Sequence, residues 1–138
     1  MKEIKRSLIA LAVVAAGACF TGLASAKDMK VTLSGANEVP PVTTSASGEG
    51  TISVADDGAV SGSISTKGIT STAAHIHMGA AGKNGGVIVP LTKEGETYKV
   101  PAGAKLTAEQ MTAFKAGDLY VNVHSAANPN GEIRAQLK

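Results

Sequence analysis

The chain has 138 residues, and its 13 basic and 11 acidic side chains give a formal net charge of +2. It contains no tryptophan, two tyrosines, two phenylalanines and one cysteine. So few aromatic side chains argue against base-stacking platforms and aromatic sugar-binding surfaces, and the core must come from Val, Ile, Leu and Ala.

The N-terminal segment has the features of a secretory signal peptide, which we predict for residues 1–26. Residues 8–23 are almost wholly apolar or small, and Ala-Ser-Ala at 24–26 fits cleavage after Ala26. The positively charged start that such a peptide needs comes from Lys2, Lys5 and Arg6. We therefore expect the protein to be periplasmic or secreted.

Two alternatives to cleavage stay open. The apolar run could remain as an uncleaved anchor, although it is short for a membrane span and is diluted by glycine and threonine. The chain could also be a lipoprotein attached through Cys19, although Ala16 stands where such a motif normally has a larger aliphatic residue.

Cleavage would leave residues 27–138 as one domain of 112 residues, which is long enough to bury a single core. The only cysteine leaves with the signal peptide, so packing or a ligand must replace disulfides. Ten basic and ten acidic residues remain, and this neutral balance argues against nucleic acid and anionic membranes as partners. We expect no membrane span in the mature chain.

Short alternating runs bounded by glycine dominate this domain, which is the pattern of an all-β protein. Pro40 and Pro41 exclude a central strand where they stand, and Asp57-Gly58 supplies a hairpin turn. Pro90 marks the edge or end of a strand, and Gly62 marks a bulge or a close backbone approach. We expect strands within residues 29–35, within a hairpin over 48–68, and at 71–79, 85–91 and 96–100.

One short helix is expected to interrupt the strands. Thr107 is placed to cap its N-terminus, with Gln110 at the capping-box position. Met111 and Phe114 form a small apolar face, and Gly117 is suited to the residue after the last turn. We interpret this helix as a connector that packs over one end of the sheets.

The two C-terminal strands, at residues 118–125 and 131–138, flank a turn rich in Asn and Pro. In the first of them alternate residues face opposite ways: Leu119, Val121 and Val123 on one face, and Tyr120, Asn122 and His124 on the other. About seven or eight short strands in this length predict a Greek-key β-sandwich or barrel with one short helix.

The candidate site is formed by the three histidines of the chain. His75 and His77 are two apart on a predicted strand, so both side chains leave the same face and their imidazoles can converge on one ion. Two ligands are seldom enough, so the third, His124, must lie on a neighbouring strand. Neutral imidazole suits copper and zinc, and we favour copper because the protein is expected to be exported.

Two sulfur-containing residue types, methionine and cysteine, also bear on this chemistry. Met78 offers a thioether, but a strand residue next to His77 points the other way, so we interpret it as a core or rim residue. The absence of cysteine from the mature chain excludes blue-copper and structural thiolate-zinc sites.

One ion pair is also expected. Glu132 and Arg134 project together from the last strand, and Glu38 stands just before the double proline. We expect Glu38 and Arg134 to pair and so to close the N-terminal loop on the C-terminal strand.

Three ordered motifs resemble the CHRD domain, which occurs in chordin and in exported bacterial proteins. They are NEVPP at residues 37–41, HIH with the later NVH at 75–77 and 122–124, and GEIR at 131–134. The resemblance runs from Val31 to Leu137 and implies an extracytoplasmic β-sandwich domain of poorly defined function. The His-x-His strand also looks similar to the copper strand of copper–zinc superoxide dismutases, although a fourth copper histidine and the zinc histidines are missing.

These observations leave three hypotheses for function. The first is an exported protein that binds copper, or less favourably zinc, through His75, His77 and His124 for storage, delivery or protection. The second is a metal-free structural or interaction module that binds a protein or glycan. The third, which we favour least, is a copper redox enzyme that uses an open position on the ion.

Overall fold

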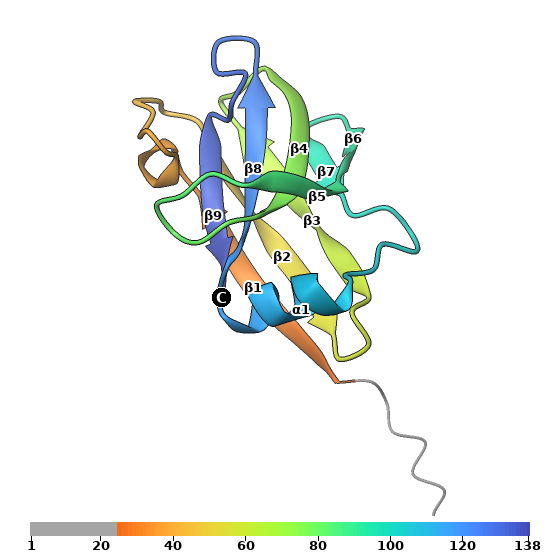
Figure 1. Cartoon of the computed structure of the whole chain (residues 1–138). Coiled ribbons are helices and arrows are strands. Elements are labelled where there is room, and N and C mark those ends of the chain that lie inside the picture. The colour runs from red at the N-terminus through yellow and green to blue at the C-terminus, as the bar shows by residue number, and fades with distance from the viewer. Residues whose placement is uncertain (1–24) are drawn as a thin grey trace, which may run out of the picture.

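The structure is a computed structural model that describes residues 25–138, so almost all of the predicted signal peptide lies outside the described residues. The described chain forms nine strands and one short α-helix, arranged as two antiparallel sheets packed face to face (Figure 1). Of the two expected architectures, the β-sandwich is confirmed, because the sheets remain separate and do not close into a barrel.

The first sheet has the strand order β1-β2-β3-β7-β6. Its strands are β1 (Ala26–Leu33), β2 (Ser47–Ala55), β3 (Val60–Lys67), β6 (Thr92–Glu94) and β7 (Thr97–Lys99). The predicted hairpin is confirmed by the pairing of β2 with β3, in which Ile52 lies opposite Gly62. A Cβ atom at Gly62 would collide with the backbone of β2, so this glycine marks the close approach that the sequence predicts.

The second sheet has the order β5-β4-β8-β9. Its strands are β4 (Ser71–Met78), β5 (Gly86–Pro90), β8 (Leu119–Ser125) and β9 (Ile133–Leu137). The chain crosses from sheet to sheet between β3 and β4, between β5 and β6, and between β7 and β8. Such crossings are typical of Greek-key sandwiches, and they place β8 directly beside β4 although 40 residues separate them.

The helix α1 (Ala108–Lys115) begins as predicted. Thr107 accepts a hydrogen bond from the Gln110 backbone, and the Gln110 side chain accepts one from the Thr107 backbone, which completes the capping box. Gly117 follows the last turn with φ +80°. Phe114 is buried in the core, so the helix covers one end of the sandwich.

Two short elements were not expected from the sequence. They are β6 and a single turn of 3-10 helix, η1 (Gly35–Asn37), which follows β1. β6 consists of three exposed residues, and such a run carries no apolar alternation by which it could be recognised.

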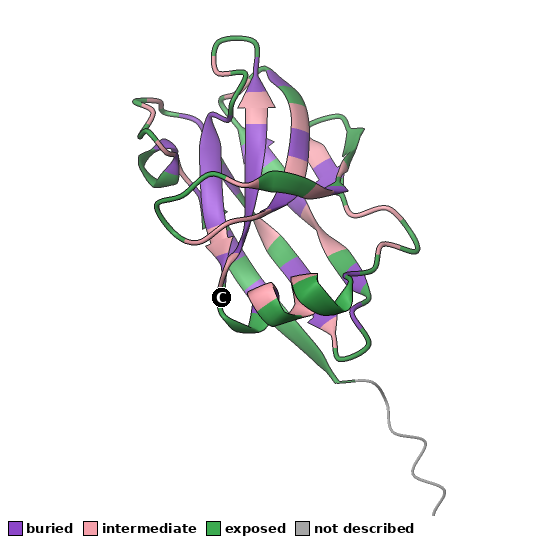
Figure 2. Cartoon of the chain, viewed as in Figure 1, coloured by how far each residue is buried: buried purple, intermediate pink, exposed green. Residues whose placement is uncertain are grey.

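The second sheet is largely buried on both faces along β8 and β9. Its inner face packs on the other sheet through apolar residues such as Ile76, Val121 and Val123. Its outer face carries polar side chains, yet Tyr120, Asn122 and Arg134 are each no more than 2% exposed. Figure 2 shows β8 and β9 buried along most of their lengths, so loops must cover the outer polar face.

Candidate metal centre

The three histidines lie on the outer face of the second sheet. β4 and β8 pair antiparallel, with His75 opposite Asn122 and His77 opposite Tyr120. His124 therefore projects from the same face, beside the other two rings. One ligand nitrogen from each histidine lies within 4.8 Å of the others. The fold therefore brings His124 to the other two histidines, as a three-histidine site requires.

Two backbone carbonyls determine the tautomers of two of these rings. His77 Nδ1 lies 2.9 Å from the Gly85 carbonyl oxygen, and His124 Nδ1 lies 2.8 Å from that of Pro129. A carbonyl oxygen only accepts, so in each neutral ring Nδ1 carries the proton and Nε2 carries the lone pair. Histidine ligands of metals are oriented by outer hydrogen bonds of this kind.

The third ring makes a contact within the cluster. His75 Nδ1 lies 3.0 Å from His124 Nε2. Because His124 Nε2 holds a lone pair, His75 Nδ1 donates this hydrogen bond. For both nitrogens to bind one ion, His75 must instead carry its proton on Nε2.

Burial favours the uncharged form of two of the rings, His75 and His77. Burial lowers the pKa of His75 below its usual value of 6.5, and the neighbouring His124 and His77 lower it further. Burial also lowers the pKa of His77, although the Gly85 carbonyl opposes this effect. The neutral form is the one that binds a metal ion, so burial prepares the site for that role.

One atom of the cluster has no hydrogen-bond partner among the described residues. His77 Nε2 is buried and unpaired, although a buried polar atom without a partner is costly. It carries a lone pair, and His77 is one of the three residues whose ligand nitrogens lie close together. Nitrogens bound to one ion lie about 3–4 Å apart when each bond is about 2.0–2.1 Å, so only a small inward movement separates this arrangement from a metal site.

A stack of side chains holds the ring of His77. Its ring plane is parallel to that of Tyr120, with centroids 4.7 Å apart. The guanidinium carbon of Arg134 lies 3.4 Å from the centroid of the Tyr120 ring. The order Arg134, Tyr120, His77 crosses three neighbouring strands, β9, β8 and β4.

Arg134 also fixes the loop of residues 79–85, which contributes to the site. Its Nη2 donates to the carbonyl oxygens of Lys83, at 2.8 Å, and Ala80, at 3.2 Å. The backbone N–H of Gly85 donates to the Tyr120 hydroxyl at 3.0 Å. The carbonyl that orients His77 is therefore held by the same stack that holds the ring.

The expected ion pair between Glu38 and Arg134 is wrong. No N–O contact within 4.0 Å joins them, and the only ion pair among residues 25–138 is the exposed Lys99–Glu94 pair. The Arg134 guanidinium instead stacks on the Tyr120 ring and donates hydrogen bonds to the carbonyl oxygens of the 79–85 loop. Glu132 does not join it either, because its carboxylate accepts hydrogen bonds from the side chains of Ser125, Thr44 and Asn128.

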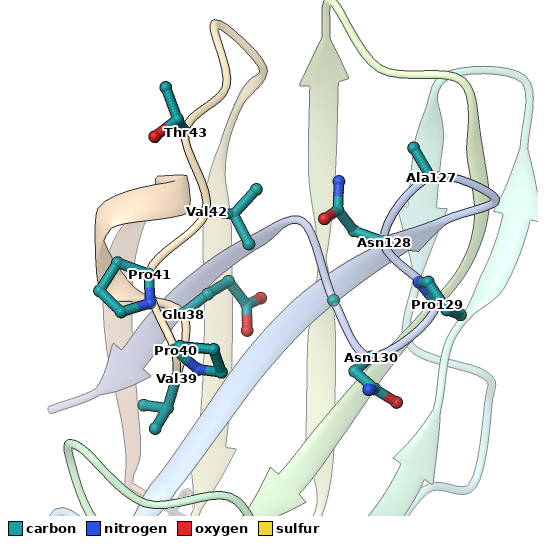
Figure 3. A pocket seen from close by; sticks show the side chains of 11 residues that line it. Glu38, Val39, Pro40, Pro41, Val42, Thr43, Ala127, Asn128, Pro129 and Asn130 are labelled. Carbon is teal, nitrogen blue, oxygen red and sulfur yellow. The ribbon is translucent and has the colours of Figure 1, made fainter.

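Glu38 is only 4% exposed, and its Oε1 has no hydrogen-bond partner among the described residues. Burial raises the pKa of Glu38 to about 7, and the charge of Arg134 and the amide of Asn122 oppose the rise only in part. Figure 3 shows this carboxylate reaching across a hollow from the double-proline segment toward the turn that contains Asn128 and Pro129.

Met78 packs against the hydrophobic core, which supports its interpretation as a core or rim residue. Sequence reasoning missed the roles of Tyr120 and Arg134. Tyr120 could have been found from its alternation with His124 on one strand face. Arg134 could not be matched with Tyr120 in the same way, because the sequence around an arginine does not show which side chain it contacts on the neighbouring strand. Its charge pointed instead to an ion pair.

A comparison with protein families matches the CHRD domain over residues 29–137. The chain belongs to the CHRD domain family. The resemblance seen in the sequence motifs is thereby confirmed over nearly the whole described chain. No curated protein and no solved structure matches the chain, so the likeness to superoxide dismutases stays a prediction. Within residues 25–138 of this CHRD domain, no helix has the length and apolar character needed to cross a membrane.

Proposed function

We propose that this CHRD domain protein is exported and binds copper through His75, His77 and His124, for storage, delivery or protection. One observation carries the proposal. A ligand nitrogen from each ring lies within 4.8 Å of the others, and the Nε2 of His77 is buried there with no hydrogen-bond partner among the described residues.

The donor set favours copper over zinc. Three neutral imidazoles bind both ions, but at a given nitrogen site Cu(II) binds more tightly than other divalent ions of the first row. Export, which the N-terminal sequence predicts, supports copper as the ion that the protein handles. Because burial lowers the pKa of His75 and His77 below 6.5, affinity should hold at pH 6.5 and fall only at a lower pH, where protons compete for the imidazole nitrogens.

The test is a calorimetric titration of the protein lacking residues 1–26 with Cu(II) and with Zn(II). We expect one equivalent of Cu(II) to bind, and each of His75→Ala, His77→Ala and His124→Ala to lose most of the affinity. Thr51→Ala, an exposed change on the other sheet, should bind as the parent does. Circular dichroism of each apo variant separates loss of a ligand from loss of the fold.

The competing function is the metal-free structural or interaction module. It is favoured by the hydrogen bond that already joins His75 to His124, and by those that join His77 and His124 to backbone carbonyls. Weak binding that all three variants retain, or variants that bind nothing only because they unfold, would support this function and contradict the metal site.

A further inference from the structure

A hollow adjoins two of the three histidines. Its volume is about 440 Å³, and the rings of His77, His124 and Tyr120 form part of its lining. Val39, Pro40 and Pro129 supply apolar walls. Ligand sites for small molecules are of this size and combine apolar walls with a few polar groups.

The walls come from segments that are far apart in the sequence but are tied together. The side-chain amide of Asn84 donates to the Val39 carbonyl oxygen at 2.7 Å, which joins the 79–85 loop to the proline segment. His124 holds the opposite wall through the Pro129 carbonyl. The contact between His124 and Pro129 therefore both orients a histidine and holds one wall of the hollow.

The charges around this hollow favour an anion once a metal ion is bound. No Asp, Glu, Lys or Arg is among its lining residues, and histidine binds a metal ion as neutral imidazole, so a bound divalent ion would keep its full charge. Arg134, behind the Tyr120 ring, adds a second positive charge. Glu38 lines the neighbouring hollows but not this one.

We propose that this hollow holds a small organic monocarboxylate, whose oxygen completes the metal site while its apolar body lies between Pro40 and Pro129. Three protein ligands leave a fourth position for such a group. A carboxylic acid is ionised at neutral pH, whereas a phenol, with a pKa near 10, is not. This inference rests on the proposed function, because without the ion the hollow has no anchor for an anion.

The experiment uses the Cu(II)-loaded protein and two probes of the same shape, benzoate and the uncharged benzamide. We expect benzoate to shift the Cu(II) electron paramagnetic resonance spectrum saturably and benzamide to leave it unchanged. Acetate should act at least about tenfold more weakly than benzoate, because it lacks the apolar body that the prolines contact.

A variant that fills the hollow tests the location. Asn130→Trp, at an exposed lining residue, should weaken benzoate binding about tenfold or more and leave Cu(II) binding intact. Ala126→Trp, exposed on the same turn but outside the hollow, is the matched control. Asn130→Leu, a smaller change, should give an intermediate loss if the tryptophan variant fails to fold.

The outcomes separate the two proposals. If Cu(II) binds, three results overturn the carboxylate site and leave the copper site standing. They are no response to benzoate, an equal response to benzamide, or an equal loss of benzoate binding in Ala126→Trp. Absence of Cu(II) binding overturns both.

Discussion

At the scale of single residues, the candidate metal centre depends on side chains other than its three histidines. Arg134 is about 1% exposed, and its guanidinium lies against the Tyr120 ring while it donates to loop carbonyls. A buried cation is tolerated when its donors are satisfied, and arginine has a planar fork that can stack and donate at once. Arg134, two strands away from His77, therefore helps to position the His77 ring through the Tyr120 ring between them.

Arg134→Met should lower the free energy of unfolding by about 3 kcal/mol, because buried carbonyls that accept from a charged donor lose it. Urea denaturation of the apo protein measures this. Lys99→Met is the control: it breaks an ion pair whose side chains are 55% exposed, so it should cost less than about 1 kcal/mol. Equal effects in the two variants would contradict the role given to Arg134.

Glu38→Gln should change how stability depends on pH. The buried carboxyl keeps its proton up to a pKa of about 7, whereas the unfolded chain releases it near 4.5. The folded state thus binds more protons between these values, and the parent protein loses the stability contributed by Glu38 as the pH rises. Between pH 5 and 8, the free energy of unfolding of the variant should therefore rise relative to that of the parent, by at most about 3 kcal/mol.

All other ionisable groups are the same in parent and variant, so their effect cancels in that difference. Glu49→Gln, at an exposed position on β2, provides the control and should show a constant difference over the same range. A flat difference for Glu38→Gln, measured by urea denaturation at several pH values, would contradict the strongly raised pKa.

At the scale of elements, local signals and packing contribute differently. The helix α1 begins where a capping box satisfies free backbone N–H groups, which is a purely local interaction. β8 begins and ends within an alternating run, but both of its faces are buried. The alternation reports which side chains share a face; it does not report what covers each face.

Thr107→Ala should lower the free energy of unfolding by about 1 kcal/mol, because the capping hydrogen bond to Gln110 is lost. Thr112→Ala in the same helix also loses a hydroxyl hydrogen bond, to the Ala108 carbonyl, but should be close to neutral because alanine is the better helix former. Thermal unfolding of both variants checks this, and a larger loss for Thr112→Ala would contradict the importance of the cap.

At the scale of the whole molecule, the sheets are separate but meet along one side. The backbones of Ser34, after β1, and Arg134, on β9, exchange two hydrogen bonds of 3.2 and 3.0 Å. The 3-10 turn and the proline segment follow at once, and they reach over the outer face of the second sheet. The proline segment, which lines the hollow beside His77 and His124, is therefore anchored where the two sheets join.

Copper should stabilise the whole domain, because its proposed ligands come from β4 and β8 and an unfolded chain cannot bring them together. At a free Cu(II) concentration one hundred times the dissociation constant, we expect a gain of about 2.7 kcal/mol, seen as a raised melting temperature. His77→Ala should abolish the gain and Thr51→Ala should keep it. A similar gain in both variants would place the binding elsewhere.

The sequence alone determined the family, the all-β class and the capped helix. It also determined that one strand face carries Tyr120, Asn122 and His124. Each depends on neighbours along the chain, whose spacing is set by strand or helix geometry. The pairing of β4 with β8, which brings His124 to the other histidines, was decided by the tertiary structure. So was the placing of Arg134 on Tyr120 rather than on Glu38, because contacts between strands distant in sequence depend on topology and burial, which no local spacing encodes.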